Sequence, residues 1–262
     1  MALSISVFTV VSALTVIAAA VLIAVQTVLS LGAGYVIAAY ALIAVSFITL
    51  LASNAKIKVA AKLFELTDTA YMRAVSYLCA AGFAADTVAY LVKIYECVSG
   101  KTHSVAAIPL FSLSMVFSLL SAFEFMLVAM SFGDDKYNFK RFSLIAFTPL
   151  LWAAVKISGL LLGYVNVAKP SDFLKAVVVA ACLLFFYRFA YEAFKDAQAS
   201  RLTLYFADVM TMCGALYFVS RVSLVIADNK NFFDYENLFA VIVLFIALFS
   251  FTLKIRIVKY GK

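Results

Sequence analysis

The sequence has few charged residues and few of the residues that interrupt helices. Only 13% of its 262 residues are Asp, Glu, Lys or Arg, and it holds 9 glycines and 3 prolines. Soluble domains carry about 25% charged residues and need a polar exterior. Here 66% of the residues are apolar, so a soluble fold would expose large apolar patches. The composition excludes a soluble enzyme, a nucleic-acid-binding protein and a disordered regulator, and leaves a polytopic α-helical membrane protein.

The sequence also lacks the motifs of enzymes and metal sites. It has one histidine and four cysteines, and no CxxC, HExxH, GxSxG or GxxxxGK[ST] pattern. Metal sites need several convergent His, Cys, Asp or Glu ligands, and phosphate binding and nucleophilic catalysis commonly use those loops. Three of the cysteines lie inside apolar runs, where a thiol packs as a small hydrophobic group. We therefore expect no metal, no cofactor and no catalytic residues, and the sequence favours a non-enzymatic protein.

The first 55 residues contain no Asp, Glu, Lys, Arg or His. A signal peptide has a basic start and an apolar stretch of only about 7–15 residues, so this run does not fit one. As one helix it would be about 80 Å long, against a hydrocarbon core of about 30 Å. The run must therefore fold back once. We expect the turn where polar residues and glycines gather, at Gln26, Ser30, Gly32 and Gly34.

Eight apolar segments are each long enough to cross a bilayer as a helix. They lie near residues 4–26, 31–53, 71–96, 105–132, 141–163, 172–194, 202–226 and 235–256. Short loops join them, so we expect antiparallel neighbours. The predicted fold is all-α, a single transmembrane helix bundle over 1–262 with no soluble domain. A finer prediction divides it into four hairpin units near 1–68, 69–136, 137–198 and 199–262. Residues 54–70 fit either an interfacial amphipathic helix or an extension of the second segment.

The three prolines mark helix starts or bends. Pro170, which precedes Ser171 and Asp172, suits the start of a helix, and Pro109 falls near the first turn of the fourth segment. Pro149 lies deep in the fifth segment, where a proline removes a backbone hydrogen bond and bends the helix. We therefore predict a kink at Pro149.

Basic residues are concentrated on one side of the predicted bundle. The loops at 54–73, 133–141 and 195–201 and the tail at 254–262 hold 13 Lys and Arg and five Asp and Glu. The loops at 96–103, 164–175 and 228–236 hold four basic and five acidic residues. Because loops rich in Lys and Arg stay in the cytoplasm, we expect both termini there and the protein in the plasma (inner) membrane. This assignment also explains the net charge of +7 without a nucleic-acid partner.

Eight ionisable residues lie inside the predicted segments, where a charge costs at least about 2.5 kcal/mol and therefore faces the interior or a partner. Four fall from the midplane toward the outside and four in the cytoplasmic half. Asp86 has Lys156 and Arg221 as candidate partners, and Arg188 and Glu192 share a helix face. The candidates for a ligand site or ion pathway are Asp86, Glu124, Lys156, Arg188, Asp208 and Arg221. The alternative is that these charges only pair and fix helix packing, with Lys93, Arg221 and Glu192 reaching an interface.

We consider three functions, of which the first two compete. A permease or channel for a small solute or ion, with a charge-lined interior, is favoured by the eight segments and by the midplane Asp86. Scarce glycine and proline argue against it, because transporter sites often use broken helices. Continuous helices suit a membrane-embedded sensory, accessory or assembly subunit. A third hypothesis is an enzyme acting on lipids, with Glu124, Glu192 or Asp208 as acid or base. Expected partners are the lipid bilayer, a small-molecule or ion ligand, and a membrane protein or a second copy of the chain.

Overall fold

The structure is a computed structural model that describes residues 2–29, 33–55, 57, 70–100, 107–132, 144–162, 170–195, 198–228 and 234–260. These residues form eight helices: α1 (Ala2–Leu29), α2 (Ala33–Asn54), α3 (Ala70–Val98), α4 (Ile108–Ser131), α5 (Thr148–Leu162), α6 (Pro170–Lys195), α7 (Arg201–Asp228) and α8 (Tyr235–Tyr260). Each predicted segment overlaps one of these helices, so the prediction of an all-helical fold is confirmed. Helices suit a bilayer because they satisfy their backbone hydrogen bonds internally.

Seven of the helices, α2 to α8, are long and apolar enough to cross a bilayer. In α1, the apolar stretch with described side chains runs from Val11 to Val25. Large apolar side chains also cover the outer surface, where Ile37, Leu161 and Leu162 are 68–75% exposed. A soluble protein would associate through such a surface, whereas a bilayer covers it. The chain is therefore a polytopic helical membrane protein.

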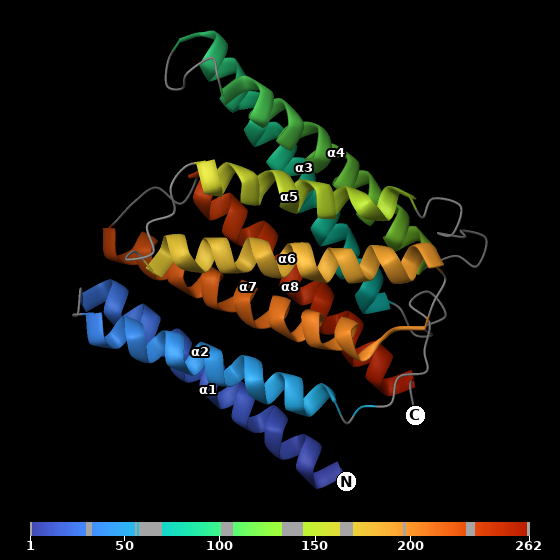
Figure 1. The fold of residues 1–262 in the computed structure, drawn as a ribbon. Helices are drawn as coiled ribbons and strands as arrows, with labels where there is room; N and C mark the ends of the chain where they lie inside the picture. Colours follow the sequence, from blue (N-terminus) through green and yellow to red (C-terminus); the bar gives the residue numbers. More distant parts are fainter. Residues whose placement is uncertain are drawn as a thin grey trace.

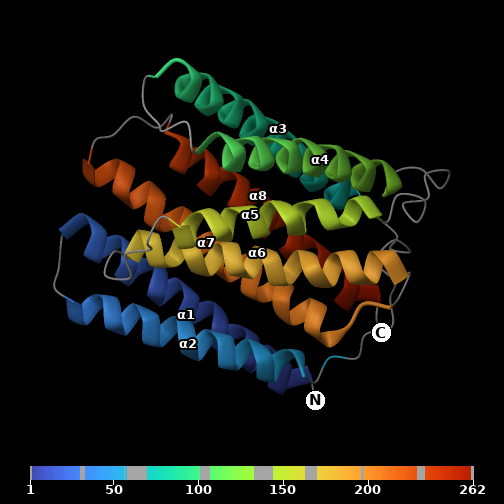
Figure 2. The same cartoon turned by 45° about the horizontal axis from the view of Figure 1, so that its top comes forward.

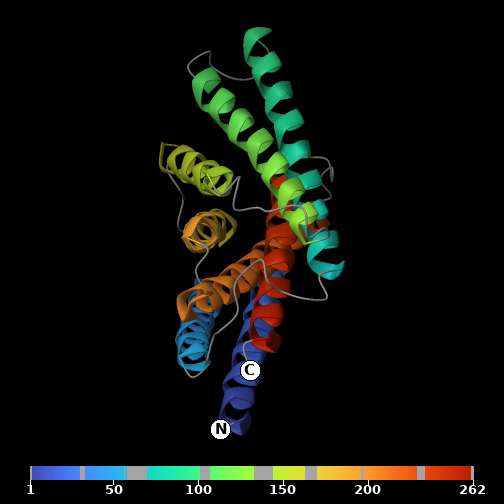
Figure 3. The same ribbon diagram turned by 90° about the vertical axis from the view of Figure 1, so that its right-hand side faces the viewer.

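Successive helices run in opposite directions, so the start of α1 and the end of α8 lie at the same end of the bundle (Figure 1). From α3 to α8 each helix packs on the next, and α1 packs on α2. In addition α3 packs on α8, and both α1 and α2 pack on α7. Figure 2 and Figure 3 show the result: α1 and α2 form one edge, α3 and α4 form the opposite edge, and α5 to α8 lie between them. The division into four hairpin units stays a prediction.

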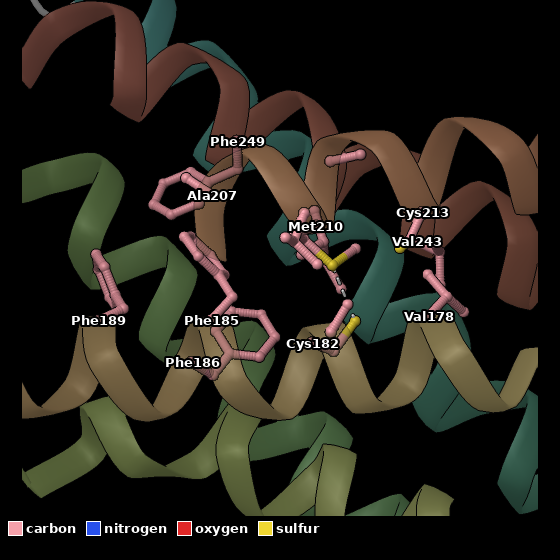
Figure 4. Close-up of a cluster of buried hydrophobic side chains, with 14 of the residues drawn as sticks. Val178, Cys182, Phe185, Phe186, Phe189, Ala207, Met210, Cys213, Val243 and Phe249 are labelled. Atoms are coloured by element: carbon pink, nitrogen blue, oxygen red, sulfur yellow. Dashed lines mark hydrogen bonds between the residues drawn. The ribbon is translucent and has the colours of Figure 1, made fainter. Parts of the chain in front are cut away.

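Apolar side chains of α6, α7 and α8 fill the interior (Figure 4). Phe185 and Phe189 of α6 meet Phe249 of α8 edge-on, with ring centroids 6.3 and 5.6 Å apart. The sulfur atoms of Cys182 on α6 and Met210 on α7 lie 3.4 Å apart. Edge-on aromatic pairs contribute about 0.5–1.5 kcal/mol beyond their burial. Such packing holds membrane helices together, because lipid tails are as apolar as the side chains and supply no hydrophobic drive.

Two of the three prolines lie where the sequence predicts them. Pro109 is the second residue of α4 and Pro170 is the first residue of α6. The predicted kink at Pro149 is wrong. Residues 144–147 form a 3₁₀ turn and α5 begins at Thr148, so Pro149 lies in its first turn. A proline there removes no helical hydrogen bond, because the first N–H groups of a helix have no partner within it.

Two further predictions fall wholly or partly outside the described residues. Residues 58–69, which include most of the predicted interfacial helix, are outside them, and so are residues 30–32 of the predicted turn. Because α1 ends at Leu29 and α2 begins at Ala33, the connection between them is shorter than the predicted turn. The prediction is wrong for Gln26, which belongs to α1, and for Gly34, which belongs to α2.

Candidate functional site

The six candidate residues do not form one site. Among them, only Asp86 and Lys156 make a described contact, with Nζ and Oδ1 3.2 Å apart. Glu124, Arg188, Asp208 and Arg221 bond to other residues in different parts of the bundle. The candidate site is therefore built around Asp86.

Asp86 lies in the middle of α3 with its side chain fully buried. Its Oδ2 accepts hydrogen bonds from the hydroxyl of Ser118 on α4 and, at 2.9 Å, from Nε1 of Trp152 on α5. Its Oδ1 accepts bonds of 3.2 Å from Nζ of Lys156 on α5 and from the hydroxyl of Tyr235 on α8. A carboxylate has about four acceptor positions, so these four donors satisfy it. Asp86 ties four helices together and offers no free oxygen lone pair to a ligand.

The ammonium of Lys156 is also fully occupied. It donates to Asp86, to the hydroxyl of Tyr90 at 2.6 Å and to the hydroxyl of Tyr235, and an ammonium has three donors. The hydroxyl of Tyr235 lies 2.8 Å from that of Tyr90. The Asp86 cluster, as we define it, consists of Asp86, Tyr90, Ser118, Trp152, Lys156 and Tyr235. Its polar groups link α3, α4, α5 and α8 into one hydrogen-bonded network.

A cavity of about 190 Å³ opens beside the Asp86 cluster. It lies at the end of the bundle where α6 and α8 begin, since Lys175 and Glu236 line it. Its other polar lining comes from Tyr90, Lys93, Ser114, Lys156 and Tyr235. We refer to this space as the lysine cavity. It faces away from the end of the bundle that holds the start of α1 and the end of α8.

The three lysines of the lysine cavity have different partners. Lys175 forms an ion pair of 2.7 Å with Glu236, and Lys156 is bonded to Asp86. Lys93 forms no salt bridge with a carboxylate of the described residues. Its Nζ instead lies 3.1 Å from the centroid of the Tyr235 ring, in a cation–π contact. The rings of Tyr90 and Phe111 also lie near this ammonium, at 5.3 and 5.6 Å from Nζ. Because no described carboxylate pairs with Lys93, the charged groups of the cavity leave a net positive charge, which favours an anion.

An aromatic layer fills the interior behind the Asp86 cluster. Phe83 of α3 contacts Trp152 edge-on at 5.0 Å and stacks on Phe125 of α4 at 5.5 Å. Phe125 in turn meets Phe186 and Phe249 at 6.1 and 5.1 Å. All five side chains are fully buried. This layer separates the lysine cavity from the opposite half of the bundle.

One face of α4 carries a row of buried polar residues past the aromatic layer. Ser114, Ser118, Ser121 and Glu124 are spaced three and four residues apart, and all are buried. The row covers about 15 Å of helix at 1.5 Å per residue. At its far end, Oε2 of Glu124 accepts a bond of 3.1 Å from Thr148, and Oε1 has no hydrogen-bond partner among the described residues. Polar groups therefore continue from the lysine cavity into the other half of α4.

Arg188 and Glu192 hold the start of α7. Oε1 of Glu192 accepts bonds from Arg188 at 3.1 Å, from the backbone N–H of Ser200 at 2.9 Å and from the hydroxyl of Thr203. Arg188 also donates to the hydroxyl of Ser200 at 2.7 Å. Ser200 directly precedes α7, so the predicted pair on α6 satisfies donors at the start of the next helix. These contacts support a structural role for Arg188.

Asp208 pairs with a residue of α8. Its Oδ2 accepts a hydrogen bond of 2.5 Å from Lys254 and one of 2.7 Å from Nδ2 of Asn54. The pair therefore connects the ends of α2 and α8 to α7, at the end of the bundle opposite the lysine cavity.

Arg221 is not a partner of Asp86 in the described contacts, although the sequence suggested it. Its Nη2 donates to Oδ1 of Asn237 at 3.0 Å and lies 3.9 Å from the carboxylate of Asp234. Both partners lie at the start of α8, one turn or less from its first residue. Arg221 therefore fastens the connection between α7 and α8.

Sequence reasoning misses the tryptophan and the two tyrosines of the Asp86 cluster. A signal exists for two of them, because Tyr90 follows Asp86 by four residues and Trp152 precedes Lys156 by four, and such pairs share a helix face. Tyr235 has no such signal, since it lies 149 residues from Asp86 in the chain.

Comparison of the chain with protein-family models, with curated proteins and with solved structures finds no match. Function is therefore inferred from the geometry of the lysine cavity and the Asp86 cluster.

Proposed function

We propose that the protein is a permease for a small anion and that the lysine cavity is its binding site. The observation that carries the proposal is Lys93, a cation in the cavity with no salt bridge to a described carboxylate. Lys156 and Tyr235 line the same cavity, but their donors are taken within the Asp86 cluster. The ammonium of Lys93 is a suitable hydrogen-bond donor to a carboxylate or another oxyanion. A volume of about 190 Å³ favours a ligand smaller than those of drug-binding pockets, which measure about 300–1,000 Å³.

Transport also needs a second state in which the binding site opens to the other side. Alternating access in carriers arises from rocking of one part of a bundle against the rest. In this proposal the aromatic layer is the closed inner gate, and the serine row of α4 with Glu124 provides polar groups beyond it. All eight helices span the membrane, the lysine cavity faces outward and both termini are cytoplasmic, as the positive-inside rule favours.

The second candidate is a sensory or accessory subunit that binds the same anion without moving it. Its support is the set of continuous helices: no described helix from α1 to α8 is interrupted, whereas transporter binding sites often use broken ones. A subunit of this kind would pass the binding event to a partner membrane protein.

Binding can be followed with Trp152, because it is the only tryptophan of the chain and bonds to Asp86. The purified protein would be titrated with sodium chloride, acetate or phosphate, with gluconate keeping the ionic strength constant. We expect a saturable change of fluorescence with at least one anion, and an affinity about tenfold weaker in K93Q. K195Q is the matched control, since Lys195 is exposed and bonds to Tyr191. No saturable change, or equal losses in both variants, would contradict the proposal.

Uptake separates the two candidates. Proteoliposomes would be tested with the radiolabelled form of the anion that changes the Trp152 fluorescence. A permease accumulates it faster than empty liposomes do, and K93Q slows this uptake. Saturable binding with uptake no faster than in empty liposomes would reject the permease and support the sensory or accessory subunit.

A further inference from the structure

A second cavity lies at the opposite end of the bundle from the lysine cavity. It measures about 760 Å³ and is bounded by α1, α2, α7 and α8. Both α1 and α8 pack on α7, and residues of all three line the space. The result is a groove with α7 as its floor and α1 and α8 as its walls. We refer to it as the α1–α8 groove.

The α1–α8 groove is mainly apolar, and its walls reach the outer surface. Ile17 of α1 and Phe251 and Ile255 of α8 line it and are 46–58% exposed. Met212 of α7 lines it as well and is buried. Because the surrounding surface of the bundle is the one that a bilayer covers, the groove opens toward hydrocarbon. An acyl chain matches both its chemistry and its access.

One end of the α1–α8 groove is basic. Arg201, the first residue of α7, is exposed, and its Nε donates to the backbone oxygen of Ile57 at 3.1 Å. Ile57 itself lines the groove. Arg201 forms no salt bridge with a carboxylate of the described residues. Lys254 also lines the groove and is neutralised by Asp208, so among the described residues at this end of the groove the charge of Arg201 is not compensated.

We infer that the α1–α8 groove binds one acyl chain of an anionic phospholipid, with the lipid phosphate against Arg201. Basic residues at a membrane surface attract anionic headgroups, and a guanidinium can bind a phosphate through two parallel hydrogen bonds. The lipid would fill the space between α1 and α8 and fasten the α1–α2 edge to the bundle. This site is independent of the lysine cavity and of the permease proposal.

Native mass spectrometry of the full chain tests the site. The protein in detergent would be mixed with equal amounts of phosphatidylglycerol and phosphatidylcholine that carry identical acyl chains. We expect one bound phosphatidylglycerol, retained about fivefold over phosphatidylcholine. R201Q should remove this preference, whereas R73Q should keep it, because Arg73 is an exposed arginine at the start of α3.

A second pair of variants tests the apolar part. Ala13 is exposed and lines the α1–α8 groove, so A13W fills it, and we expect phosphatidylglycerol occupancy to fall about fivefold. Ala18 is exposed on the same helix but does not line the groove, so A18W is the control. Equal retention of both lipids, or unchanged occupancy in A13W and R201Q, would overturn the inference. A dimer that A13W alone dissociates, without lipid preference in the wild type, would assign the groove to a second copy and also overturn it.

Discussion

At the scale of single residues, Asp86 is the side chain whose change should destabilise the fold most. Four donors from three other helices bond to it. In D86N the amide nitrogen would face donors, and the ammonium of Lys156, whose side chain is 8% exposed, would lose its counter-ion. Removing one partner of a buried pair costs about 3–5 kcal/mol. We therefore predict a large fall in the thermal unfolding temperature of D86N in detergent, measured by circular dichroism.

The companion variant K156Q shows whether the ion pair causes this loss. It leaves the carboxylate of Asp86 without its cation, so it should also destabilise the protein. In D86N/K156Q two neutral side chains replace the pair, and we expect it to be more stable than either single variant. Additive losses in the double variant would show that the two residues are not coupled.

Glu124 should respond differently to the loss of its acid group. Its side chain is fully buried, bonds to Thr148 and forms no salt bridge with the described residues. A charge is costly to desolvate without a partner, and glutamine keeps the shape and an oxygen for Thr148. We predict that E124Q unfolds within a few degrees of the wild type, whereas E124L unfolds earlier because Thr148 loses its acceptor. A loss in E124Q as large as that in D86N would point to a cation partner instead.

The pairing of Asp86 with Lys156 can be predicted because both are intramembrane charges of opposite sign at a similar depth. Depth alone does not say which helices are neighbours, and for this reason the sequence makes Arg221 a second candidate partner of Asp86. A tyrosine at the start of a span is typical of the headgroup level, yet the hydroxyl of Tyr235 reaches inward to Asp86. The missed residues, Tyr90, Trp152 and Tyr235, have amphipathic side chains. Each side chain has a single polar atom, which a hydropathy scale does not detect.

At the scale of helices, α7 and α8 approach closely at Gly214. A β-carbon there would lie 2.7 Å from Cβ of Ala247 and 3.2 Å from the backbone oxygen of Val243. Small residues allow such contacts between membrane helices. G214A must move α7 away from α8, and we predict a loss of about 1–3 kcal/mol in the free energy of unfolding, measured by denaturation in detergent.

G159A on α5 is the matched control for this change. A β-carbon at Gly159 would meet only Cδ2 of Leu110, at 3.3 Å, and this atom ends a flexible side chain. Alanine also favours a helix over glycine by about 1 kcal/mol. G159A should therefore be neutral or stabilising. An equal loss in both variants would contradict the explanation by close packing.

The helices can be predicted from the sequence, whereas their contacts cannot. Hydrocarbon thickness fixes the length of a span, so apolar runs locate all eight segments. Hydropathy does not reveal the backbone geometry at the ends of these segments. The kink predicted at Pro149 is wrong for this reason, because α5 begins at Thr148 after a 3₁₀ turn. The packing of α3 on α8, which completes the Asp86 cluster, joins distant segments without any local pattern.

At the scale of the whole molecule, the two cavities lie at opposite ends of the bundle. The lysine cavity is at the end where α8 begins, and the α1–α8 groove is near the end where α8 finishes. If the basic loops are cytoplasmic, the lysine cavity faces outward and the groove lies in the inner leaflet. Anionic lipids are concentrated in that leaflet, so one orientation suits both proposed ligands.

This orientation can be tested by cysteine labelling, because all four native cysteines are buried. Ser99 lies in an exposed turn after α3, at the end of the lysine cavity, and Gln198 is exposed before α7, at the opposite end. We predict that a membrane-impermeant maleimide labels S99C in intact cells and labels Q198C only after the cells are opened. Unmodified protein controls for reaction of the native thiols. The reverse pattern would place the lysine cavity on the cytoplasmic side, and the basic loops would then face outward, against the rule that assigned them.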